Sequence, residues 1–309
     1  MRVLIIAAED EGSNLSQLCM ELRRAGQADA RCLVLGGRQD RLAVGDVSVF
    51  ADGGEELRTL LAAADHVHLV DIRVAATDVA GTSLAELVTG RRCTAHVRRL
   101  DGAAADELAA FARASGGGVC SERPTLASSL GATFLPPFVP VQRGIYRPLP
   151  PGTRGRADLS RKATVHASSL VPFRRRPNLE ALVDRAEIEA PAGVVVDTMV
   201  AERQSRVLRR KRHAEVALGA WDDGIGRSGI EALCQGVRLI AACDRDSLEA
   251  YASWTGAPAP VEDAAGLEAA LAELRPREDS PEEVSTWAAR MLAPGRYFET
   301  LRAVWTTSI

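Results

Sequence analysis

The sequence predicts an α/β protein with two parallel, doubly wound β-sheets, one in each half of the chain. Short apolar segments of strand length alternate with amphipathic segments of about ten residues in both halves. Prolines concentrate between positions 136 and 151, and 309 residues suffice for two domains that each have a core. We therefore expect a first domain over 1–152, a second over 153–295, and a final helix within 296–309.

In the first half, strands are expected where apolar residues are continuous, and helices where they recur at helical spacing. The expected strands are 2–8, 30–36, 47–50, 66–72, 92–98 and 117–121, and the expected helices are 14–26, 55–64, 83–88 and 104–114. Ligands of such sheets bind at the carboxyl ends of the strands. His96, near the end of one strand, and Asp71, just after another, are therefore candidate site residues. A structural role inside the sheet is the alternative for both.

The composition bounds the class of protein. The chain is 46% apolar and 26% charged, which is typical of a globular protein, and its net charge of −3 gives no general reason to expect a nucleic-acid partner. It has no run of eighteen apolar residues, and its N-terminus turns acidic early, so we expect a cytoplasmic protein without a membrane span. Six cysteines without a C-x-x-C pair argue against a zinc site or a disulfide framework, and predict buried free thiols.

In the second half the same alternation continues. The expected strands are 163–169, 193–199, 214–218 and 237–242, and the expected helices are 179–185, 201–212, 228–234, 247–254, 263–274, 282–292 and 297–305. The basic run 209–212 either complements a helix dipole or binds an anionic lipid or nucleic acid. The Asp-x-Asp sequence at 244–246 is interpreted as a loop, and we predict no metal site.

A glycine-rich turn joins the strand at 214–218 to the helix at 228–234. Gly226 and Gly229 keep side chains away from the start of this helix. Unpaired backbone amides near Arg227, Ser228 and Gly229 could therefore receive a diphosphate. An ordinary packing turn is the alternative interpretation.

Two carboxylates flank this turn, with seven residues between Asp223 and Glu231. Segment 223–242 resembles the retaining GT-B glycosyltransferases, in which a Glu, a Gly-aromatic-Gly turn and a second Glu are followed by Ala, a small or apolar pair, Gly and a buried strand. Here Asp223 replaces the first Glu and Ile225 the aromatic residue, and the match is close over about twenty residues. The resemblance implies two Rossmann-like domains that face a cleft, with the last helix crossing back to the first domain.

The resemblance also implies roles for individual residues. Asp223 would contact the donor sugar, Glu231 the ribose, and His96 the transferred sugar. In the family, the loop after the first strand of the second domain supplies an Arg and a Lys to the diphosphate. Ser168 or Ser169 stands at the Arg position here, and Arg174 or Arg175 is nearest to the Lys. A guanidinium can still grip a phosphate, although a solvated basic run is the alternative.

The first turn of the first domain faces the cleft in the family, so Gly12 and Ser13 are expected near substrate, with a plain turn and helix cap as the alternative. The implied activity is a metal-independent, retaining, hexosyltransferase-like glycosyl transfer from a UDP- or GDP-sugar, without a cofactor. Helix amides together with Arg174 or Arg175 would stabilise the leaving diphosphate.

Several alternatives stay open at this point. The acceptor could be a saccharide, a lipid, a small molecule or modified DNA, the last contacted through the basic segment 203–212 as in some phage enzymes. A catalytically silent GT-B relative that serves as a binding or scaffold protein is the leading alternative, and a nucleotide-sugar epimerase is a further one. The oligomeric state is open.

Overall fold

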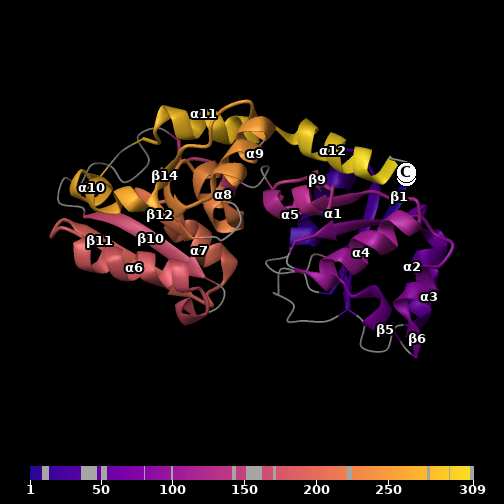
Figure 1. The fold of residues 1–309 in the computed structure, drawn as a ribbon. Helices are drawn as coiled ribbons and strands as arrows, with labels where there is room; N and C mark the ends of the chain where they lie inside the picture. The colour runs from indigo at the N-terminus through magenta and orange to yellow at the C-terminus, as the bar shows by residue number, and fades with distance from the viewer. Residues whose placement is uncertain are drawn as a thin grey trace. The chain divides into compact units, whose positions relative to one another are not determined.

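The computed structural model describes residues 1–8, 14–35, 47–49, 54–79, 81–98, 100–140, 144–150, 162–169, 172–220, 225–276, 279–291 and 293–306 (Figure 1). The chain forms two compact units. The first comprises Met1–Pro140 and Pro294–Ile309, and the second comprises Val141–Ala293. The C-terminal helix α12 (Pro294–Thr306) is thus part of the first unit.

The first unit contains a seven-stranded parallel sheet with the order β3-β2-β1-β4-β7-β8-β9. Its strands are β1 (Arg2–Ala7), β2 (Asp29–Val34), β3 (Val47–Val49), β4 (His66–Val70), β7 (Cys93–Val97), β8 (Val119–Ser121) and β9 (Thr133–Phe134). Its longer helices are α1 (Asn14–Arg24), α2 (Gly54–Ala63), α3 (Leu84–Val88), α4 (Ala103–Ala114) and α5 (Pro124–Ser129). Chain order reverses between β1 and β4, which is the switch point of a doubly wound sheet.

The two faces of this sheet are covered by different helices. Leu57 of α2, Leu84 of α3 and Leu108 of α4 pack with alternate residues of the strands in one buried core. On the other face, α12 contributes Trp305, whose ring lies near His66 and His68 of β4. Because successive strand residues point to opposite faces, β7 places Cys93 in the first core and His96 on the α12 face.

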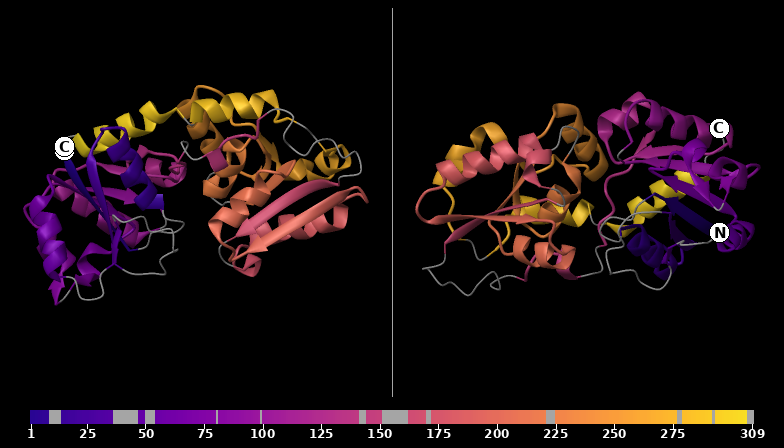
Figure 2. Two further views of the ribbon diagram at one scale, coloured as in Figure 1. Left: turned by 180° about the vertical axis from the view of Figure 1, so that it is seen from behind. Right: turned by 90° about the horizontal axis from the view of Figure 1, so that it is seen from below.

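The second unit contains a five-stranded parallel sheet with the order β11-β10-β12-β13-β14. Its strands are β10 (Ala163–Ser169), β11 (Val194–Val200), β12 (Val216–Ala220), β13 (Arg238–Ala242) and β14 (Val261–Asp263). Its helices are α6 (Pro177–Glu189), α7 (Gln204–Lys211), α8 (Gly226–Cys234), α9 (Arg245–Thr255), α10 (Leu267–Ala272) and α11 (Glu282–Met291). Figure 2 shows α6 on one side of this sheet and α7 and α8 on the other.

The predicted class, α/β with a parallel sheet in each half, is confirmed. Most differences lie at edges and ends. The helix expected over 263–274 is shorter, because β14 and the 3-10 turn η5 (Ala264–Gly266) precede α10. The short edge strand β9, helix α5 and the hairpin of β5 (Asp78–Val79) and β6 (Thr82–Ser83) were not predicted. Strands of two or three residues are too short to show an alternating pattern.

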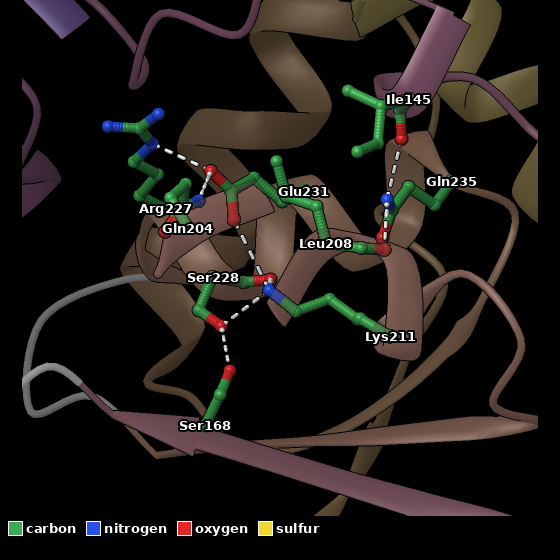
Figure 3. Close-up of polar contacts among 9 residues, drawn as sticks. All are labelled: Ile145, Ser168, Gln204, Leu208, Lys211, Arg227, Ser228, Glu231 and Gln235. Carbon is green, nitrogen blue, oxygen red and sulfur yellow. Dashed lines mark hydrogen bonds and ion pairs between the residues drawn. The ribbon is translucent and has the colours of Figure 1, made fainter. Parts of the chain in front are cut away.

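Residues 144–150 pack with the second unit. Gln235, fully buried at the end of α8, donates from Nε2 to the Ile145 carbonyl at 2.6 Å and to the Leu208 carbonyl at 2.9 Å (Figure 3). Arg212 donates to the Pro148 carbonyl at 3.1 Å. These bonds to α7 and α8 explain why the division between the units lies at Pro140, before the last prolines of the Pro-rich segment.

Two sequence predictions concern general properties. All six cysteines are free thiols, five of them buried, which confirms that prediction. Among the described residues, no helix is both long enough and apolar enough to cross a membrane.

Candidate functional site

The candidate site lies at the switch point of the second sheet. The chain passes from β10 to β11 on one side and then returns to β12 on the other side of β10. Ligands of open α/β sheets bind outside the carboxyl ends of the strands at such a point. Ser168, near the end of β10, and helix α8, which follows β12, lie at this position.

Two hydroxyl groups meet there. Ser168 Oγ lies 3.4 Å from Oγ of Ser228, the third residue of α8, and both side chains are half-buried (Figure 3). Ile225, at the N-cap position of α8, supplies no side-chain cap. The start of a helix carries amides without intrahelical partners and a partial positive charge. The combination of two hydroxyls and a helix start is suited to an anion.

Lys211, the last residue of α7, lies beneath Ser228 and is only 1% exposed. Its Nζ donates to Ser228 Oγ at 2.8 Å, to the Ser228 carbonyl at 3.1 Å and to Glu231 Oε2 at 3.2 Å. An ammonium group has three donors, so all three are used. Burial lowers the pKa of Lys211, and the Glu231 carboxylate opposes that shift.

Glu231 is buried at 2% exposure, and its carboxylate is held by side chains of α7 and α8. Oε1 accepts from Gln204 Nε2 at 2.8 Å and from Arg227 Nε at 2.8 Å, while Oε2 accepts from Lys211. A carboxylate offers about four acceptor positions, so one is left after these three bonds. Lys211, Arg227 and Glu231 together carry a net charge of +1 when all three are ionised.

Glycines allow the close packing of this helix. Gly226 has φ +63°, a conformation that favours glycine. A Cβ at Gly229 would lie 2.8 Å from Ile225 Cγ2 and 2.9 Å from Leu239 Cδ2, so a side chain there would clash with the strand beneath. The predicted role of these glycines, to keep side chains away from the helix start, stays a prediction.

Arg174 and Arg175 belong to the 3-10 turn η4 (Phe173–Arg175), which follows β10 in the chain. Both are exposed, and neither forms an ion pair within the described residues. Asp223 and Gly12, by contrast, lie outside the described residues. The predicted pairing of Asp223 with Glu231 about a diphosphate therefore stays a prediction.

His96 lies in the first unit, on the α12 face of β7, and is 2% exposed. Its ring is 5.7 Å from the ring of His68, and its Nε2 is 3.8 Å from Glu122 Oε1. Burial lowers the pKa of His96 to about 3. Asp71 has φ +47°, and its Oδ1 accepts from the backbone amide of Arg98 at 2.7 Å, which is a structural role.

The basic run at 209–212 is largely used inside the second unit. Arg210 pairs with Asp197, Lys211 is buried against Glu231, and Arg212 bonds a backbone carbonyl. Arg209 is exposed. Within the described residues, its side chain bonds only the Ser205 carbonyl of its own helix. Lys211 and Arg212 are thus engaged inside the unit, whereas Arg209 and Arg210 are exposed.

The Asp-x-Asp sequence also has a structural explanation. Asp244 is the N-cap of α9, and its side chain accepts from the Ser247 amide at 2.7 Å and from the Ser247 hydroxyl at 2.6 Å. A capping carboxylate of this kind is a common way to satisfy amides at a helix start.

Sequence reasoning missed Lys211 and Gln204 as parts of the site. A signal for Lys211 was present, because it follows the buried residues Val207 and Leu208 by four and three positions, which places it on the same helix face. Gln204 reaches Glu231 from another helix, 27 positions away in the chain. No sequence spacing indicates that contact.

No protein-family model matches the sequence, and no curated protein matches it. Among solved structures, T4 phage BGT in complex with its UDP-glucose substrate matches with a TM-score of 0.53 and 11% identity, over 99% of this chain and 100% of that chain. The chain has the GT-B fold. MurG from Acinetobacter baumannii matches with a TM-score of 0.49, and the UDP-GlcNAc 2-epimerase from Neisseria meningitidis bound to UDP-GlcNAc with 0.48, at 11% and 10% identity. These two matches cover 98% of this chain and 99% and 98% of theirs, respectively.

Proposed function

We propose that the protein is a metal-independent glycosyltransferase that binds the diphosphate of a nucleotide sugar at the start of α8. The observation that carries this proposal is the meeting of Ser168 and Ser228 at the switch point of the second sheet, above the buried ammonium of Lys211. The similarity in fold to a protein that has UDP-glucose as its substrate supports a UDP-sugar as the donor.

The electrostatics of this location favour a diphosphate. Lys211 donates to Ser228 Oγ, so the hydroxyl proton of Ser228 is free to point outward to Ser168 or to a phosphate oxygen. The net positive charge of Lys211, Arg227 and Glu231 adds to the partial charge of the helix start. Preorganised donors of this kind stabilise the charge that develops on a leaving diphosphate.

Roles are also proposed for the other candidate residues of the second unit. Arg174 and Arg175, exposed on the turn after β10, are proposed to contact the phosphates. Glu231 has one acceptor position left, which a ribose hydroxyl can use once the buried carboxylate becomes accessible. Asp223 is proposed to contact the donor sugar, so Asp223→Ala should spare nucleotide binding and lose turnover.

The test is a thermal-shift panel of UDP, GDP, ADP, dTDP and their sugars with the wild type and Ser228→Asp. Ligand at a hundred times its dissociation constant should stabilise the wild type by roughly 2.7 kcal/mol. The substitution puts a carboxylate where the diphosphate binds, next to the Lys211 ammonium. An acidic residue in a first helical turn is itself stabilising by about 0.3–1 kcal/mol, so the variant should fold and lose the nucleotide response.

Thr125→Asp is the matched control, because it adds the same charge to an exposed first-turn position of α5 in the other unit. It should keep the full response. A Ser228→Asp protein that still responds to nucleotides as the wild type does would refute the location of the site. A wild-type protein that responds to none of the nucleotides would refute the function.

Turnover assays separate the remaining alternatives. Isomerisation of the nucleotide sugar without an acceptor would identify an epimerase, and nucleotide binding without turnover of any donor would identify a silent binding protein. A modified-DNA acceptor is less compatible with α7, since the basic run there is largely paired or buried. Salt-dependent DNA binding would restore that alternative.

A further inference from the structure

A cluster of three possible metal ligands lies in the first unit, whereas the proposed donor site belongs to the second. His68 of β4, His96 of β7 and Cys120 of β8 are each at most 2% exposed. One ligand atom from each side chain lies within 4.8 Å of the others. The three residues come from adjacent parallel strands, and His96 is directly opposite Cys120 in the register of β7 and β8.

The second observation is that polar atoms of this cluster lack partners. Neither ring nitrogen of His96 has a hydrogen-bond partner within the described residues, and the same holds for His68 Nε2. A buried polar atom without a partner destabilises the folded state, and such atoms are rare in native proteins. Three such nitrogens beside a buried thiol are therefore available as ligands.

We propose that His68, His96 and Cys120 bind a transition-metal ion of the Zn²⁺ type, with water in a fourth position. Imidazole nitrogen and thiolate sulfur are ligands of Zn²⁺, and catalytic zinc sites combine three protein ligands with a water molecule. Zn–N bonds of about 2.0–2.1 Å and Zn–S bonds of about 2.3 Å put tetrahedral ligand atoms roughly 3.3–3.6 Å apart. The ligand atoms lie within 4.8 Å of one another, so side-chain rotations must bring them to that spacing when the ion binds.

The surroundings of His68 fit a metal ligand. Its Nδ1 lies 2.8 Å from Thr94 Oγ1, which in turn lies 2.8 Å from His66 Nε2. A zinc-bound histidine usually donates its other ring N–H to an oxygen, which fixes the orientation of the ring. Binding through His68 Nε2 requires the proton on Nδ1, and Thr94 Oγ1 is in place to accept it.

Trp305 of α12 makes the proposal observable by fluorescence. Its Nε1 donates to His68 Nδ1 at 3.2 Å, which requires an Nδ1 without a proton. When a metal binds Nε2 and the proton moves to Nδ1, Trp305 loses this acceptor. Metal binding should therefore change the emission of Trp305, and the change should be absent in Trp305→Phe.

The proposed zinc ligands belong to the first unit and the proposed diphosphate site to the second. The sequence analysis expects no zinc site, since the cysteines lack C-x-x-C spacing. That criterion cannot detect ligands that come singly from three strands, at positions 68, 96 and 120.

The experiment is titration of the full chain, freed of metal with a chelator, with Zn²⁺ and Co²⁺. The expected result is one ion per chain and, for Co²⁺, a thiolate-to-cobalt charge-transfer band in the near ultraviolet. Cys120→Ala should lose the band and weaken Zn²⁺ binding more than about 100-fold, because loss of even an outer partner costs 10–100-fold. His96→Gln should weaken binding while the sulfur remains.

Cys93→Ala is the matched control. Cys93 is a buried thiol of β7, but it lies in the core on the opposite face of the sheet. This variant should bind Zn²⁺ and show the cobalt band as the wild type does. The proposal is overturned if the folded wild type binds neither ion, or if the cobalt band survives in Cys120→Ala. If Cys120→Ala does not fold, His96→Gln decides, because unchanged Zn²⁺ affinity in that variant also overturns the proposal.

Discussion

The buried ion pair of Lys211 and Glu231 provides a direct test of the site's architecture. Lys211→Met keeps the length and the apolar stem of the side chain but leaves Glu231 with only Arg227 and Gln204 as partners. Removal of one partner from a buried pair costs about 3–5 kcal/mol. Because two donors to Glu231 remain, we expect the lower end, about 3 kcal/mol. In a unit of this size that is a decrease in melting temperature of about 6–12 °C.

The chain offers a matched control, since Lys162 is its only other lysine and is exposed. Lys162→Met should change the free energy of unfolding by no more than about 0.5 kcal/mol. Urea denaturation of both variants measures the difference. A Lys211→Met variant as stable as Lys162→Met would show that the buried pair in α7 and α8 is not formed.

A double-mutant cycle with Glu231→Gln separates the pair from general packing. Glu231→Gln alone leaves the Lys211 ammonium buried without its counter-charge. The double variant should therefore lose less stability than the sum of the two single variants, by about 0.5–3 kcal/mol. Strict additivity would contradict direct coupling of the two charges.

Three further predictions concern single positions in the second unit. Gly229→Ala should lower the free energy of unfolding, measured with urea, by about 1–3 kcal/mol because the added Cβ meets close neighbours. Gly193→Ala is the control, since nothing lies within 4 Å of its added Cβ. Equal losses of stability in the two variants would contradict the packing of α8. Burial lowers the pKa of His166 to about 4, so its contribution to stability is complete above about pH 6.5 and is lost as the pH falls to about 4, by roughly 3 kcal/mol. His166→Gln should flatten that part of the pH-stability curve. An unchanged curve would show that protonation of His166 is not the cause of the loss of stability. Arg174→Ala should weaken the nucleotide response without changing the melting temperature of the free protein, and an unchanged response would remove Arg174 from the site.

The sequence contained most of the information needed for the fold. Strands such as β1 and β13 are buried on both faces, so their continuous apolar runs could be recognised from the sequence alone. The helix ends were less predictable. Helix α6 extends from Pro177 to Glu189, beyond the expected 179–185, because tertiary contacts of Leu179 and Ala186 stabilise turns that the pattern leaves ambiguous.

The sequence indicates the candidate site by local features, but it does not indicate the surroundings of Glu231. The β12–α8 turn was identified because glycine and a helix start are local features of the sequence. The environment of Glu231 is not local, since Gln204 and Lys211 reach it from α7. A run of four basic residues is usually solvated, and only the helical spacing of Lys211 with Val207 and Leu208 distinguishes it from its neighbours.

Lys211 also bears on one difference between this chain and the family pattern that it resembles. The family pattern implies an Arg at the end of the first strand of the second domain, and Ser168 or Ser169 stands there instead. Lys211 brings a positive charge to the same switch point from α7, but its three donors are all used by Ser228 and Glu231. It therefore cannot bond a phosphate directly, as an Arg on the loop would. Its charge can act only through the Ser228 hydroxyl and through space, which makes Ser228→Asp a more specific test of diphosphate binding than any substitution of the lysine itself.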